Sequence, residues 1–190
     1  GGTLIAVDCG MSARRLVGAL REEGIEKGDL NGIVLTHSHK DHTLGVATMV
    51  YKHHVPLYCT RRTLNDLDRR YGREFDRGSY REVVTGEEFA IGGLRIVGTA
   101  VDHDTPDCHS YTITDEAGRR LTIATDLGYV PEGLMARMGE SDAVVLESNY
   151  SETMLAISKY PPILRQRIDS DSGHLSNTQC GEAIGRLRGS

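Results

Sequence analysis

Thr36-His37-Ser38-His39-Lys40-Asp41-His42 is the stretch of this chain from which its fold can be inferred. It follows an apolar run at residues 32–35 that has the composition and length of a buried strand, and it precedes residues 43–51, whose spacing predicts a helix. We therefore expect the stretch where a strand ends and a helix begins. Three imidazoles and a carboxylate within six residues are ligands that zinc and similar divalent ions take.

The alternative for this histidine motif, residues 36–42, is a polar loop of solvated histidines. The chain has 8 His among 190 residues, so His-x-His-x-Asp-His arises by chance on the order of once in a thousand such sequences. The spacing therefore favours a metal site.

Length and composition favour one domain over residues 1–190 with a sizeable core. The chain has no Trp and only 2 Phe, so its core is built mainly from aliphatic side chains, and its 22 Gly imply many tight turns. Both features favour a sheet-rich α/β protein. The net charge of -5 argues against a uniformly cationic surface for nucleic acid, but it leaves room for a local basic groove.

Cysteine usage and hydropathy bear on the cell compartment. The four cysteines are far apart, and the chain does not begin with a charged and then apolar signal segment. We therefore expect a cytoplasmic protein with reduced thiols. No apolar run approaches the ~18 residues of a membrane span, so no membrane partner is expected, and no obligate protein partner is inferred.

Apolar runs and turn residues predict the remaining elements. In the first half they predict strands at 4–7 and 55–59 and helices at 13–23 and 61–71. In the second half they predict strands at 83–84, 88–91, 94–101, 111–114, 121–124 and 144–146, a helix at 131–138, and helices after 148 that include one at 180–187. Asp8, at the end of the first strand, either satisfies its own turn or orients the histidine motif.

Three more candidate ligands follow predicted strands or precede a predicted helix: His103, Asp126 and His174. Taken singly, each is an ordinary turn or capping residue.

Together, the histidine motif and these three residues resemble the metallo-β-lactamase superfamily. That resemblance implies an α/β fold, an αββα sandwich of two mixed sheets flanked by helices. Five segments look more narrowly like the WalJ/YycJ branch of these hydrolases, which is associated with DNA exonuclease activity. They are residues 5–10, 102–104, 125–128, 147–149 and 173–177. The chain departs from the branch where Asn149-Tyr150-Ser151 stands for the usual Asn-His-Asp, and the usual first and last strands are expected to be missing.

The resemblance also implies a ligand set for two divalent ions, with zinc first and manganese or iron as alternatives. One ion would take His37, His39 and His103, the second would take Asp41, His42 and His174, and Asp126 would bridge them. The expected activity is a phosphodiesterase or nuclease, an exonuclease on DNA, that uses a hydroxide held between the metals. Asp41, Asp126 and His174 are the expected catalytic residues, with Asp41 accepting the proton of the attacking water.

Substrate contacts are predicted from a local excess of arginine. Residues 61–81 contain seven arginines against four acids, which indicates either a solvated helix face or a rim that contacts phosphates. The candidate substrate-binding residues are Arg61, Arg62, Ser176 and Asn177.

Two other functions remain open. A thioester or lactam hydrolase of the glyoxalase II type can use the same seven ligands, although glutathione-type substrates usually meet a helical C-terminal domain for which this chain has no room. A metal-stabilised binding protein without catalysis is the third interpretation, and one ion fully enclosed by protein would favour it.

Overall fold

The computed structural model describes residues 2–72, 78–105 and 107–189. The chain divides into two compact units, Gly1–Ile96 and Val97–Ser190. The single domain expected over 1–190 stays a prediction. Four charged residues of the arginine-rich stretch lie outside the described residues: Arg73, Glu74, Asp76 and Arg77.

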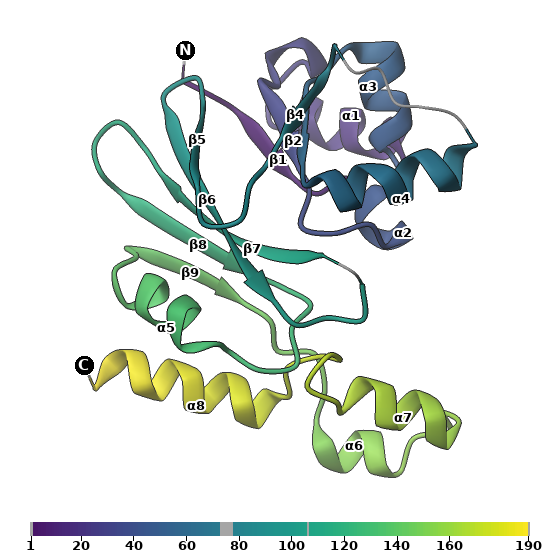
Figure 1. Ribbon diagram of the computed structural model, residues 1–190, viewed down its shortest axis with the longest axis vertical. Coiled ribbons are helices and arrows are strands. Elements are labelled where there is room, and N and C mark those ends of the chain that lie inside the picture. Colours follow the sequence, from purple (N-terminus) through teal and green to yellow (C-terminus); the bar gives the residue numbers. More distant parts are fainter. Residues whose placement is uncertain (1, 73–77, 106, 190) are drawn as a thin grey trace. The chain divides into compact units, whose positions relative to one another are not determined.

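A parallel sheet organises the first unit. Its strands, in spatial order, are β1 (Ile5–Val7), β2 (Gly32–Val34), β3 (Leu57–Cys59) and β4 (Tyr80–Glu82). Parallel neighbours need crossover connections, and helices supply them. These helices are α1 (Ala13–Glu22), α3 (Val46–His53) and α4 (Arg61–Tyr71), with a short 3-10 turn, η1 (Lys27–Asp29), before β2 (Figure 1).

The core of this unit lies between the sheet and these helices. Ile33 of β2, Met49 of α3 and Leu64 of α4 are completely buried in one cluster. Side chains fix the helix starts, because Ser12 accepts a hydrogen bond from the Arg15 amide at the start of α1. Thr60 does the same at the start of α4. The helix predicted at 61–71 begins and ends as predicted.

Two predicted elements of the first unit differ in the structure. The helix expected at 43–51 is two helices, α2 (Lys40–Thr43) and α3, so the helical part of the histidine motif begins at Lys40. The strand expected at 83–84 lies earlier as β4, because Tyr80 pairs with Leu57 of β3.

The second sheet is mixed. Its strand order is β5 (Glu88–Ile91), β6 (Leu94–Val101), β7 (Cys108–Thr114), β8 (Arg120–Ala124) and β9 (Ala143–Leu146). Strands β7 and β8 are antiparallel, whereas β8 and β9 are parallel. The first sheet thus differs from the expected mixed sheet, since its described pairs are all parallel.

Helices accompany the strands in the described part of the second unit (Figure 1). They are α5 (Glu132–Gly139), α6 (Glu152–Ala156), α7 (Pro162–Ile168) and α8 (Asn177–Arg188). Leu134 and Met138 of α5 pack with Ala124 of β8 in a buried cluster, which Leu187 of α8 also contacts. None of the helices described is both long enough and apolar enough to cross a bilayer.

Candidate metal centre

The histidine motif begins where β2 ends, and Asp8 fixes its backbone. Asp8 directly follows β1, and its carboxylate accepts hydrogen bonds of 2.8 Å from both the amide and the hydroxyl of Thr36. The same carboxylate lies 2.7 Å from Nδ1 of His42. Asp8 has a left-handed φ of 63°, which Asp tolerates better than most residues. Of the two roles left open for Asp8, these contacts support the one in which it orients the motif.

A close backbone approach places α2 beside the loop that follows β1. The Cys9 amide donates to the His42 carbonyl at 2.8 Å. A Cβ atom at Gly10 would lie 1.6 Å from the carbonyl oxygen of Asp41. Only glycine fits at this position without moving the motif.

The three imidazoles of the motif lie close together. The ring centroid of His37 lies 4.7 Å from that of His39 and 4.2 Å from that of His42. Nδ1 of His37 lies 2.9 Å from the Thr36 hydroxyl, and Nδ1 of His42 faces Asp8. A partner at Nδ1 orients the ring and makes Nε2 the atom that a metal takes.

Asp41 differs from the three histidines in its exposure. It lies in the first turn of α2, and 82% of its side chain is exposed. Its Oδ2 atom lies 3.8 Å from Nε2 of His42. The first unit thus holds three clustered imidazoles and a carboxylate at their solvent side.

The second unit brings its three predicted ligands together. His103 follows β6, Asp126 follows β8, and His174 precedes α8. One ligand atom from each lies within 4.8 Å of the others. The imidazoles of His103 and His174 meet edge to face, with centroids 5.2 Å apart.

Glu147 holds this second cluster, a role that its local sequence does not indicate. It directly follows β9, and its Oε1 atom lies 2.7 Å from Nδ1 of His174. Its other oxygen accepts hydrogen bonds of 3.2 Å from the amides of Leu127 and Leu175. The hydrogen bond to Glu147 raises the pKa of His174, although burial opposes the shift.

His103 and Asp126 are also oriented by their surroundings. Nδ1 of His103 lies 3.0 Å from the Gly173 carbonyl, so Nε2 is again the atom presented. Asp126 adopts a left-handed φ of 57° in the turn after β8, and its Oδ1 atom lies 3.5 Å from Nδ1 of His174. Only 13% of its side chain is exposed.

These donor sets suit a divalent transition metal ion. Imidazole nitrogen and carboxylate oxygen are the ligands of zinc, manganese and iron sites. Metal-binding histidines in proteins usually donate their other ring nitrogen to a carboxylate or a carbonyl oxygen. His42, His103 and His174 each have such a partner: Asp8, the Gly173 carbonyl and Glu147.

The arginine candidates lie at the start of α4. A nitrogen of the Arg61 guanidinium lies 2.6 Å from a Glu82 oxygen, and the group stacks 5.2 Å from the Tyr80 ring centroid. Arg62 is exposed in the same turn. The ion pair favours a structural part for Arg61, while the phosphate contacts of both arginines stay predictions.

Ser176 and Asn177 lie at the start of α8. Ser176 is buried, and its hydroxyl donates to Glu152 at 2.6 Å while accepting a bond from the Gln179 amide. The side chain of Asn177 accepts a 2.7 Å bond from Ser148. Ser176 and Gln179 thus form a capping box at the start of α8, and the substrate contacts of Ser176 and Asn177 stay predictions.

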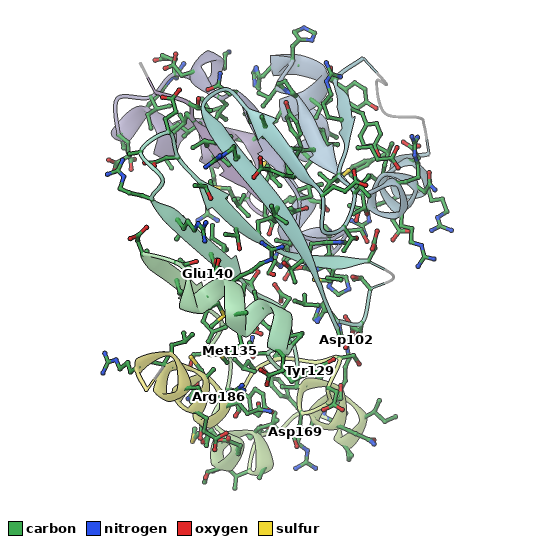
Figure 2. The ribbon with its side chains drawn as sticks, turned by 60° about the vertical axis from the view of Figure 1, so that its left-hand side comes forward. Asp102, Tyr129, Met135, Glu140, Asp169 and Arg186 are labelled. Atoms are coloured by element: carbon green, nitrogen blue, oxygen red, sulfur yellow. The ribbon has the colours of Figure 1, made fainter. Side chains whose placement is uncertain are left out.

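Tyr150, which departs from the expected branch pattern, has a defined partner. Its hydroxyl donates to Asp169 at 2.6 Å, and Asp169 is labelled in Figure 2. Partial burial and the Asp169 carboxylate raise the pKa of Tyr150 far above its usual range. The side chain is thereby kept as a neutral phenol.

Comparison with known proteins identifies the family. The chain is 29% identical over 188 residues to the exodeoxyribonuclease WalJ of Streptococcus pneumoniae, covering 97% of this chain and 69% of that protein. It is 28% identical over 180 residues to the exodeoxyribonuclease YycJ of Bacillus anthracis, covering 95% of this chain and 67% of that protein. The chain thus spans about two thirds of the length of either relative.

The fold comparison agrees. The metallo-beta-lactamase fold protein YhfI from Bacillus subtilis superposes with a TM-score of 0.71 at 15% identity, covering 97% of this chain and 70% of that chain. This confirms the predicted fold class, with one parallel and one mixed sheet. The model of the beta-lactamase superfamily domain matches residues 3–190. The chain therefore belongs to the beta-lactamase superfamily.

Proposed function

We propose that this protein is a divalent-metal-dependent phosphodiesterase that acts as an exonuclease on DNA. The observation that carries the proposal is the cluster of His103, Asp126 and His174, whose ligand atoms lie within 4.8 Å of one another. The two relatives named as exodeoxyribonucleases support the choice of substrate.

The ligand assignment is part of the proposal. His37, His39 and His103 would hold one ion, Asp41, His42 and His174 would hold the other, and Asp126 would be shared by both. Zinc fits this set of nitrogen and oxygen donors, and manganese or iron fits it as well. Bound ions would supply an activated water at neutral pH and neutralise charge on the phosphate.

The chain's own residues have distinct parts in this reaction. Glu147 and Asp8 keep their histidines oriented, as the 2.7 Å contacts to His174 and His42 show. Asp41 is exposed and is the carboxylate placed to accept a proton from water. Asp126, largely buried, would supply the negative charge that keeps two cations close together.

A substrate panel on the metal-free and metal-loaded protein tests the proposal. We expect hydrolysis of linear DNA and of bis-p-nitrophenyl phosphate that requires added divalent metal and is abolished by a chelator. Preferential cleavage of a thioester or a lactam would overturn the phosphodiesterase assignment. One tightly enclosed ion with no hydrolysis of any substrate would favour a metal-stabilised binding protein.

Metal stoichiometry tests the ligand assignment separately. Elemental analysis of wild-type protein should give two ions per chain, and His174→Asn should lose the ion that it ligates. His53→Asn, at the end of α3, is the matched control and should retain both ions. Equal metal content in wild type and His174→Asn would show that His174 is not a ligand.

A further inference from the structure

The hairpin formed by α6 and α7 carries the most exposed apolar side chains of the described chain. Four exceed half exposure, and all lie within ten residues: Met154 at 65%, Ile157 at 73%, Tyr160 at 53% and Ile163 at 82%. Several exposed large apolar side chains within one short segment indicate an interaction site.

The charge of the same segment is positive, in a chain whose net charge is -5. Residues 153–168 contain Lys159, Arg165 and Arg167 and no acidic residue. Glu152 and Asp169 stand at its two borders and keep their negative charges, since their donors Ser176 and Tyr150 are neutral, and Arg167 pairs with Asp104. Lys159 and Arg165 remain as the cations next to the exposed apolar side chains in the sequence, and they complement a polyanion.

The hairpin is held in shape by its own contacts. The Arg165 guanidinium donates to the Ala156 carbonyl at 2.7 Å and so links α7 to the end of α6. Leu155 is buried beneath the hairpin, and Ser151 caps the start of α6. The exposed side chains thus project from a fixed base.

That base is bonded to the candidate metal ligands of the same unit. The His174 amide donates to the Ile168 carbonyl at 2.9 Å, at the end of α7. The Arg167 guanidinium pairs with Asp104, which directly follows His103. A Cβ atom at Gly173 would lie 2.2 Å from the Arg167 carbonyl, so the chain before His174 is packed tightly against α7.

We infer that the α6–α7 hairpin binds the single-stranded end of a DNA substrate, stacking bases on Tyr160 and its apolar neighbours while Lys159 contacts a phosphate. Exposed aromatic and apolar side chains accept bases of any sequence, and adjacent cations hold the backbone. This inference rests on the proposed nuclease function, because it adds a binding surface next to the His103 and His174 ligands.

Binding of a labelled oligothymidine of about 16 nucleotides, followed by fluorescence anisotropy in the presence of a chelator, tests the inference without cleavage. Tyr160→Ala should weaken binding by about 5- to 100-fold, and Tyr160→Phe should restore it, because the ring alone stacks. Lys159→Gln should reduce the salt dependence of binding by about 0.7 in logarithmic slope. Ile184→Ala on α8 and Lys52→Gln on α3 are the matched controls.

The outcomes separate this inference from the proposed function. If the wild type cleaves DNA but Tyr160→Ala binds the oligonucleotide as tightly, the hairpin is not the binding surface. If the wild type cleaves neither DNA nor bis-p-nitrophenyl phosphate, the nuclease function fails, whatever the hairpin binds. Two results would replace DNA as the occupant: a wild-type dimer that Ile163→Ala makes monomeric, or Tyr160-dependent sedimentation with anionic phosphatidylserine vesicles.

Discussion

Glu147 and His174 form the contact that fixes the second cluster of candidate metal ligands, with Oε1 and Nδ1 2.7 Å apart. Glu147→Gln keeps a side chain of similar size but removes the negative charge that makes the imidazole a better ligand. We expect metal affinity to fall by about 10- to 100-fold, measured by competition with a chromophoric chelator. Glu140→Gln is the control. Glu140 lies at the end of α5 (Figure 2) and pairs with Arg120, away from the candidate ligands. Unchanged affinity would remove Glu147 from the site.

Asp126 is expected to be essential for turnover but not for folding. Asp126→Asn cannot supply the charge that keeps two cations close, so hydrolysis of bis-p-nitrophenyl phosphate should fall by orders of magnitude. Circular dichroism should match that of the wild type. Asp115→Asn, in the β7–β8 hairpin turn, controls for loss of a carboxylate elsewhere. Near wild-type rates with full metal content would exclude the bridging role.

Gly10 should be intolerant of any side chain. In Gly10→Ala the new Cβ meets the Asp41 carbonyl at 1.6 Å, and a backbone atom cannot rotate away. We expect the free energy of unfolding to fall by about 1–3 kcal/mol or more, with loss of metal binding. Gly18→Ala is the matched control: no atom lies within 4 Å of its Cβ, and the helix α1 should gain about 0.4–1 kcal/mol. Urea unfolding measures both, and equal stability of the two variants would contradict the geometry.

The arginines at the start of α4 give a test of phosphate contact. The double variant Arg61→Ala with Arg62→Ala should lower kcat/KM for DNA, mainly by raising KM. Hydrolysis of bis-p-nitrophenyl phosphate should be nearly unchanged, because this small ester does not reach the arginines. Arg61 is bonded to Glu82, so Glu82→Gln is a control that breaks the ion pair and keeps the cation. Equal effects on both substrates would show that these arginines form a solvated helix face.

Sequence predicted those elements whose ends are set by local chemistry. Helix 61–71 agrees at both ends because Thr60 caps it and Gly72 has a left-handed φ of 63°. Strands 88–91 and 94–101 agree because the turn at Gly92 separates them. The break between α2 and α3 was missed, since it depends on Gly45, where a Cβ would lie 2.5 Å from the Met11 carbonyl. Such a contact is not visible in local spacing.

The same distinction holds for the candidate metal centre. The histidine motif is local, so its ligands were predicted from spacing. Glu147 was missed because its role depends on a partner 27 residues away, and a carboxylate after a strand is common. One feature of the sequence could have indicated this role: Glu147, like Asp8, is a carboxylate that directly follows a strand.

Tyr150 stands where the expected branch has His, and it is either an acid for the leaving group or a structural residue. Its hydroxyl donates to Asp169 at 2.6 Å, and its pKa is raised above the ordinary Tyr value. A raised folded-state pKa means that the neutral phenol stabilises the fold below the ordinary pKa of about 10 and that this stability is lost at higher pH. We therefore expect a structural role.

Tyr150→Phe should lower the free energy of unfolding at neutral pH by about 1–3 kcal/mol, because a hydrogen bond to a carboxylate is lost. Asp169→Asn should produce part of the same loss, since it weakens the acceptor of that bond. The rate of DNA cleavage relative to bis-p-nitrophenyl phosphate hydrolysis should not change if Tyr150 is structural. This ratio tests the acid role, because p-nitrophenolate leaves without a proton whereas a DNA alkoxide requires one. A selective loss of DNA cleavage in Tyr150→Phe, with unfolding unaffected, would instead identify Tyr150 as the leaving-group acid.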